Sequence, residues 1–185
     1  MAGQAPAVNR PPAAAATAPH APLVEAARDG DEQAFGQLYG LYGPMVHGIL
    51  LARVPVDEVA DLVQDVFLLA FRRLRTLRDC AAFGAWLAMI ARNRAMDFHR
   101  RSRETTELPE DLARVDNKET EAREVLALIR SLPEAYRETL VLRLVEGMTG
   151  PEIALRTNLT PASVRVNLHR GMKLLREKLG GQEAT

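Results

Sequence analysis

The clearest chemistry in the sequence lies close to its C-terminal end, on a predicted basic helix. Arginine and asparagine form paired hydrogen bonds with guanine and adenine, and valine contacts the methyl group of thymine. If Val164 and Leu168 are buried, the side chains facing away or lying on the flanks are Ser163, Arg165, Val166, Asn167, His169, Arg170 and Lys173. This set predicts a helix that reads duplex DNA, with a solvated basic helix as the simpler alternative.

Two helices joined by a tight turn are predicted to position this surface. Thr149 and Glu152 have capping-box spacing, and Pro151 falls in the first turn, where its missing N–H is harmless. The short helix that follows ends at Asn158, a residue type that tolerates the left-handed backbone of a turn. Thr160 is suited to cap the next helix. This order is typical of a helix-turn-helix.

A second basic segment precedes this one in the chain. From Arg92 to Arg103 there are five arginines and one aspartate, a net charge of +4. Aromatic residues beside arginines suit single-stranded nucleic acid, but Trp86, spaced with Leu87 and Ile90, is predicted to lie in the core. Four polar side chains of the segment share one helix face: Asn93, Asp97, Arg100 and Arg101.

A third candidate surface lies on the helix whose apolar stripe runs from Val59 to Ala70. Opposite this stripe lies a polar ridge that contains one leucine. Its members are Asp61, Gln64, Asp65 and Leu68. The residues alone leave two interpretations open, a protein-docking surface and an ordinary solvated face.

Helical periodicity predicts an all-α fold of two small helical domains joined by a flexible linker. Asp31 is expected to cap an early helix, and no segment alternates with the period of two that a strand requires. We predict a disordered Ala/Pro-rich tail at residues 1–22, a first helical domain at 23–103, an acidic linker at 104–122 and a second helical domain at 123–180.

Composition excludes several classes of protein. The 185 residues carry 24 basic and 24 acidic side chains, and the single cysteine, Cys80, excludes a disulfide framework and a cysteine-based zinc site. No apolar run is long enough for a membrane span, no secretion signal is found, and a cytoplasmic location is predicted. No nucleophile set, phosphate loop or metal cluster is recognised, so we expect neither an enzyme nor a cofactor. The zero net charge hides a −5 segment from Glu104 to Glu124 between two basic ones.

The order of these motifs resembles a known family. Three runs are similar to conserved region two of bacterial ECF (extracytoplasmic-function) sigma factors of the sigma-70 family: Asp61-Leu-Val-Gln-Asp-Val-Phe67, Phe83-Gly-Ala-Trp-Leu87 and Ile90-Ala-Arg-Asn-Arg-Ala-Met-Asp97. Three others are similar to their region four: Leu132-Pro-Glu-Ala-Tyr-Arg137, Glu146-Gly-Met-Thr149 and Glu152-Ile-Ala154. The resemblance spans residues 23 to 180.

The resemblance implies a sigma factor that binds core RNA polymerase and directs promoter-specific initiation. By position, the ridge of Asp61, Gln64, Asp65 and Leu68 would dock on the clamp helices of the largest polymerase subunit. The −10 element would be bound by Arg92, Asn93, Asp97, Arg100 and Arg101. The −35 element would be bound by Ser163, Arg165, Val166, Asn167, His169, Arg170 and Lys173. The resemblance also implies control by an anti-sigma factor and a free chain that is monomeric and not inserted in a membrane.

This chain departs from the family pattern at several positions. Gly150 and Pro151 replace the usual aromatic and acidic residues, and Asn158 stands where many members have glycine. The reading helix contains Val164-Arg-Val-Asn-Leu168, which predicts an altered −35 preference. Two alternatives remain open, a dimeric DNA-binding repressor or activator, and a sigma-factor mimic that sequesters a regulator. The mimic would not need the basic faces.

Overall fold

The computed structural model describes residues 19–105 and 117–182, and within these ranges the chain is helical, without strands. The all-α prediction is confirmed. None of the described helices is both long and apolar enough to cross a bilayer. Two short 3-10 turns, Leu74–Thr76 and Cys80–Ala82, separate α3 from α4. The helices are α1 (Ala21–Arg28), α2 (Glu32–Leu51), α3 (Val56–Arg73), α4 (Phe83–Thr105), α5 (Asn117–Arg130), α6 (Glu134–Leu144), α7 (Gly150–Thr157) and α8 (Pro161–Gln182).

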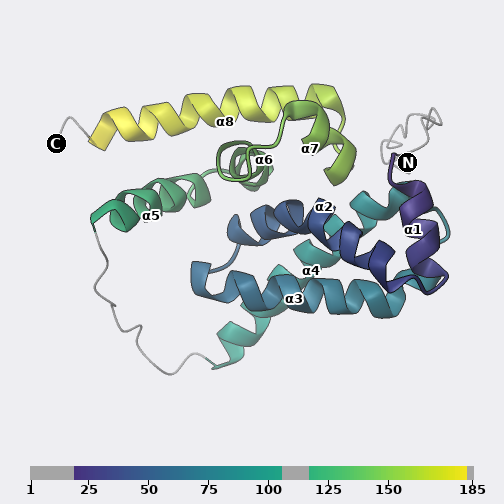
Figure 1. Cartoon of the computed structure of the whole chain (residues 1–185). Helices are drawn as coiled ribbons and strands as arrows, with labels where there is room; N and C mark the ends of the chain where they lie inside the picture. Colours follow the sequence, from purple (N-terminus) through teal and green to yellow (C-terminus); the bar gives the residue numbers. More distant parts are fainter. Residues whose placement is uncertain (1–18, 106–116, 183–185) are drawn as a thin grey trace, which may run out of the picture.

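The first block consists of α1 to α4, with α2, α3 and α4 packed against one another (Figure 1). The carboxylate of Asp31 accepts a hydrogen bond from the amide of Ala34 at 3.0 Å, so the predicted N-cap of α2 is confirmed. The predicted stripe of α3 is buried, as at Val63 and Val66, and Trp86 packs partly buried against the same core. Each helix therefore buries one apolar face and leaves the other for solvent.

Helix α1 is an element that the sequence analysis did not predict. It has only eight residues, too few for a clear helical period, and it begins at Ala21, inside the predicted tail. Burial of Val24 and Ala27 against the start of α2 holds it in place. Tertiary packing therefore stabilises a helix that would be marginal by itself in water.

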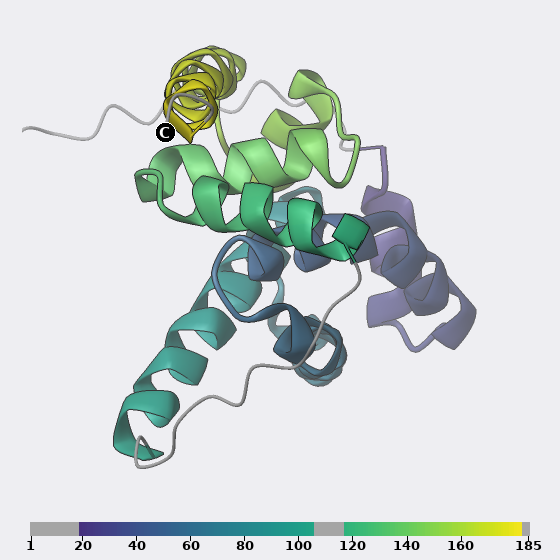
Figure 2. The same ribbon diagram turned by 90° about the vertical axis from the view of Figure 1, so that its left-hand side faces the viewer.

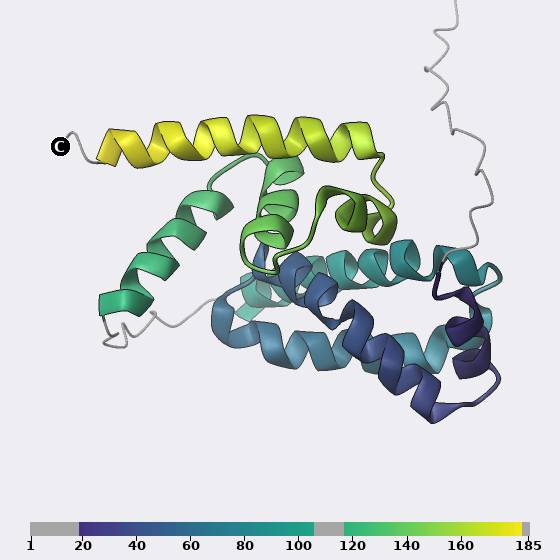
Figure 3. The same ribbon diagram turned by 45° about the horizontal axis from the view of Figure 1, so that its top comes forward.

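The second block consists of α5 to α8, and Figure 3 shows α8 lying across α6. Gly171 is buried at this crossing, where a Cβ would lie 3.0 Å from Cδ1 of Leu140 and 3.1 Å from Cβ of Tyr136. A glycine here lets the two helices approach closely. One side of α8 is therefore packed on α6, and the opposite side faces solvent.

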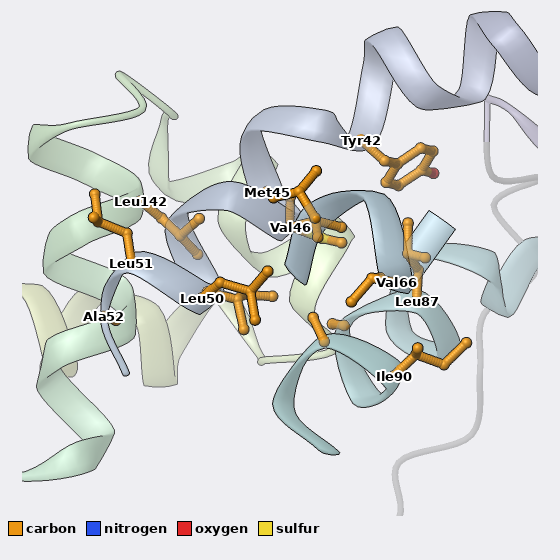
Figure 4. Packing of buried hydrophobic residues seen from close by; sticks show 14 of the residues in the cluster. Tyr42, Met45, Val46, Leu50, Leu51, Ala52, Val66, Leu87, Ile90 and Leu142 are labelled. Carbon is orange, nitrogen blue, oxygen red and sulfur yellow. The ribbon is translucent and has the colours of Figure 1, made fainter. Parts of the chain in front are cut away.

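The two blocks share one apolar core instead of standing apart. α2 packs on α6 and α4 packs on α7, and Figure 2 shows α5 to α8 stacked against α1 to α4. A Cβ at Gly48 would lie 2.8 Å from Cδ2 of Leu142, and Figure 4 shows Leu142 in the cluster with Leu50 and Leu51 of α2. The absence of a side chain at position 48 allows this contact.

Arginines and a histidine add polar contacts between the blocks. Arg130 of α5 donates to the carbonyl oxygen of Leu51 at 2.7 and 2.9 Å, at the end of α2. Arg156 of α7 donates to the carbonyl oxygen of Leu41 at 3.0 Å. His47 Nδ1 lies 2.6 Å from Oε1 of Glu146. These contacts satisfy backbone carbonyls and fix how the blocks fit together.

The predicted linker at residues 104–122 is shorter in the structure. α4 continues to Thr105 and α5 begins at Asn117, so helices enter the predicted linker from both sides. The remaining linker residues, 106–116, and the predicted tail through residue 18 lie outside the described residues.

The pair of His47 and Glu146 predicts a pH-dependent contribution to stability. The hydrogen bond to Glu146 raises the pKa of His47 above its usual 6.5. The pair therefore stabilises the folded chain fully below pH 6.5, and this stabilisation is lost as the pH rises through the raised pKa of His47. We expect His47→Gln to lower the thermal midpoint more at about pH 6 than at about pH 8.5. In a Glu146→Gln background this pH dependence should vanish, and its persistence there would contradict the assignment.

Candidate nucleic-acid and protein interfaces

The start of α7 is fixed by the predicted capping box. Glu152 accepts a hydrogen bond from the amide of Thr149 at 2.8 Å, and the Thr149 hydroxyl accepts from the amide of Glu152 at 3.4 Å. Hydrogen bonds from Thr149 hold the pKa of Glu152 below its usual range. Ile153 and Ala154 are buried beneath this turn. The capping prediction is confirmed in both directions.

The turn between α7 and α8 is set by a left-handed residue. Asn158 has φ 63° and ψ 25°, a conformation that costs most other residues energy. The hydroxyl of Thr160 then accepts a hydrogen bond from the amide of Ser163 at 3.1 Å, and α8 begins at Pro161. Two helices joined in this way form the predicted helix-turn-helix.

Helix α8 presents most of its predicted reading face to solvent. Val164 and Leu175 are buried, which orients the helix. Two predicted members, Ser163 and Asn167, are partly covered, and the Ser163 hydroxyl is 2.8 Å from that of Thr160. The exposed members are Arg165, Val166, His169, Arg170 and Lys173. These side chains combine cationic groups, which pair with phosphates and base edges, with a valine that can contact the methyl group of thymine.

The four residues predicted to share a face of α4 lie on one side of the helix, and Arg92, also expected to bind the −10 element, lies off it. Asn93, Asp97 and Arg100 follow at helical spacing on an at least partly open side, with Arg100 Nη2 3.0 Å from Oδ1 of Asp97. Arg101 is exposed as well. Arg92 points elsewhere, because it faces the second block and binds Glu138 there. Arg92 therefore lies apart from the other four side chains.

The ridge on α3 is exposed as predicted, but it is part of a larger apolar surface. Asp61, Gln64 and Leu68 are exposed, and the half-exposed Asp65 lies 3.6 Å from Nη2 of Arg94. About half the surface of Leu68 is open, and a groove of about 290 Å³ lies beside it. The groove is lined by Phe35, Tyr39, Gln64, Phe67, Leu68 and Phe71.

Sequence reasoning missed the aromatic part of this groove and a second apolar groove on the other block. Phe71 follows Leu68 by three residues, a spacing that could have predicted the first. The second groove, of about 570 Å³, lies between α5 and α6 and includes the exposed Val125, Leu144 and Val145. The apolar run that continues past the end of α6 was its only signal.

No group of three or more acidic, histidine or cysteine side chains placed to hold a metal ion occurs in the described parts of the chain. The four candidate surfaces are thus two basic faces and two apolar grooves. Such surfaces bind nucleic acid and protein.

Comparison with known proteins identifies the family. Residues 38–105 match the family described as Sigma-70 region 2, and residues 122–175 match Sigma-70, region 4. The RNA polymerase sigma factor CarQ of Myxococcus xanthus is 35% identical over 169 residues, covering 86% of this chain and 97% of CarQ. The chain belongs to the ECF branch of the sigma-70 family. The ECF RNA polymerase sigma-E factors of Haemophilus influenzae and Escherichia coli K12 are each 31% identical over 176 residues, covering 85% of this chain and 93% and 92% of theirs.

Two solved structures resemble this sigma factor in fold. CnrH in complex with the cytosolic domain of CnrY has a TM-score of 0.64 at 26% identity, covering 88% of this chain and 97% of CnrH. The sigma factor RpoE of Bartonella quintana, in complex with the anti-sigma factor NepR, has a TM-score of 0.56 at 21% identity, covering 79% and 96%. The second likeness concerns the fold alone.

The left-handed turn of this sigma factor predicts the effect of substitutions at Asn158. Asn158→Val should lower the free energy of unfolding by about 1–2 kcal/mol, because a branched side chain is strained at φ 63°. Asn158→Gly should be close to neutral, since glycine adopts this conformation freely. Urea denaturation of the full chain measures both, and equal losses for valine and glycine would contradict the turn assignment.

Proposed function

We propose that this chain acts in the cytoplasm as a non-catalytic subunit of RNA polymerase, without a cofactor, and directs it to promoters with −10 and −35 elements. The observation that carries the proposal is the occurrence of two basic helix faces on separate blocks, within sigma-70 regions two and four in that order. A single DNA-reading helix would suffice for an ordinary repressor or activator. A mimic that only sequesters a regulator would need neither basic face.

The ridge on α3 and its aromatic groove are proposed to bind core polymerase. An exposed apolar groove bordered by Asp61 and Asp65 suits a partner helix with apolar and basic side chains. Leu68 lines this groove together with the exposed Tyr39 and Phe71, so the three form a contiguous apolar patch. The groove thus gives the ridge the apolar anchor that protein interfaces require.

The two basic faces are proposed to divide the promoter between them. The α4 set, Arg92, Asn93, Asp97, Arg100 and Arg101, would bind the −10 element as it melts, because amide and guanidinium groups pair with unstacked bases and phosphates. The reading face of α8 would enter the major groove of the −35 duplex. Its polar side chains would there meet base edges, and Lys173 and Arg170 would meet phosphates.

An anti-sigma factor is proposed as a further partner of this chain. Both structural neighbours are named as complexes, one with the cytosolic domain of CnrY and one with the anti-sigma factor NepR. In this chain the apolar grooves beside Leu68 and beside Val145 are available to such a partner. An inhibitor that covers the first groove would exclude core polymerase directly.

The direct test is transcription with purified components. The full chain and core RNA polymerase are incubated with genomic DNA fragments, and run-off transcripts are sequenced. We expect co-elution with core polymerase and transcripts that share −10 and −35 elements. The absence of both transcripts and co-elution would overturn the proposal.

Charge reversal on the ridge should separate core binding from folding. Asp61→Arg with Asp65→Arg places two cations on the proposed docking surface and should abolish co-elution with core polymerase. Helical content by circular dichroism should be unchanged, because Asp61 is exposed and about half of the Asp65 side chain is open to solvent. The matched control is Glu25→Arg with Asp29→Arg, two exposed positions on α1 and at its C-cap, which should leave co-elution intact. Loss in both variants would mean that charge alone, and not the ridge, determines binding.

Substitution of Asn167 should alter the −35 preference. A good paired contact to a base contributes about 1–3 kcal/mol of discrimination, so Asn167→Ala should relax selection at one position by roughly tenfold or more. Selection of −35 variants from a randomised promoter library measures this change. Lys173→Ala, which is proposed to contact phosphate, should weaken all promoters alike and serves as the control. An unchanged sequence preference after Asn167→Ala would exclude direct reading there.

A further inference from the structure

Glu138 of α6 joins the two blocks by a nearly buried carboxylate. It is 6% exposed, and its Oε1 lies 2.6 Å from Nη2 of Arg92 while its Oε2 lies 3.0 Å from Nε of the same residue. Nη2 of Arg53 approaches Oε2 at 2.7 Å. Burial opposes ionisation, but the two arginines hold the pKa of Glu138 below its usual range. The carboxylate is therefore a shared counter-ion for two cations of the other block.

This contact covers one side chain that the proposed function assigns to DNA. Arg92 belongs to the proposed −10 set, and its guanidinium has the forked geometry that binds phosphate as readily as carboxylate. The groove of about 610 Å³ beside Glu138 is lined by residues of both blocks, including Met89 of α4 and Asn158 and Asn167 of the helix-turn-helix. The two DNA-binding surfaces thus partly face one another across this groove.

The closed arrangement is too short for both promoter elements at once. Elements centred at −10 and −35 are about 25 base pairs apart, or about 85 Å at 3.4 Å per pair. α8 has 22 residues and a length of about 33 Å, and it lies on a block in direct contact with the block that carries α4. Simultaneous binding to both elements therefore requires the blocks to separate.

We propose that Glu138 is an internal latch, which pairs with Arg53 and Arg92, competes with DNA phosphates for Arg92 and holds the free chain in a closed form with low DNA affinity. The latch rests on the proposed function for the identity of its DNA ligand. The closed form of the free chain is measured without DNA and does not depend on that function. Opening lets water solvate Glu138 and frees Arg92, so separation of the charges costs little once both sides are hydrated. Removal of Glu138 alone leaves two cations facing one another in the closed form.

Isosteric removal of the charge tests the latch. In Glu138→Gln we expect the radius of gyration of the full free chain to increase in small-angle scattering. The affinity of this variant for a labelled single strand of about 20 mixed nucleotides should rise by roughly tenfold. A rise of this size is expected if the open, binding-competent form increases from about a tenth of the molecules to nearly all of them. Glu25→Gln removes the same charge from an exposed position on α1, outside both proposed DNA-binding sets, and it should change neither quantity. Equal affinities and equal radii for Glu138→Gln and wild type would overturn the latch.

The latch and the proposed function fail separately. Failure of the wild type to support transcription with core polymerase would overturn the proposed function, whereas the radius of gyration of the free chain, measured without DNA or polymerase, tests the latch alone.

Discussion

The apolar core shared by the two blocks is the constraint on which the rest of the structure depends. Leu142 of α6 is completely buried beside Gly48 of α2, and complete burial of a leucine side chain stabilises a fold by about 1.5–3 kcal/mol. The ion pairs of Glu138 contribute less on balance, because the attraction of buried charges is offset by their desolvation. Loss of Glu138 alone would nevertheless cost about 3 kcal/mol, the lower end of the usual range because Arg92 keeps 31% of its side chain exposed. Apolar contact therefore closes the chain, and the charges determine whether it stays closed.

Features that depend on neighbouring residues could be predicted from the sequence. The capping box at Thr149, the turn at Asn158 and the buried stripe of α3 each require only a few consecutive residues or a helical period. The exposed positions of the reading face and of the ridge followed from the same periods. Three members are more covered than a free helix would predict: Ser163 by its own cap, Asn167 beside the groove at Glu138, and Asp65 by its contact with Arg94.

Features that depend on contacts between distant segments could not be predicted in this way. Periodicity identifies which side of a helix is buried, but it does not identify the partner. Arg92 and Glu138 are 46 residues apart, and nothing in either local sequence connects them. The aromatic groove required α2 and α3 to be placed side by side, and α1 was too short to give a period. The resemblance assigned Arg92 to the −10 element, and its pairing with Glu138 in the second block could not be predicted from its helix.

The close packing around Gly84 limits the substitutions that this chain tolerates at position 84. A Cβ there would lie 3.0 Å from the carbonyl oxygen of Arg156 and 3.0 Å from Cε1 of Tyr42, so even alanine would press on backbone. A side chain at this position would act as a wedge between α4 and α7. Under the proposed latch, genetic selection for increased promoter output in the absence of an inducing signal would therefore recover interior glycine substitutions alongside surface changes. Residues of this interior contact would then help to set the strength of the regulator.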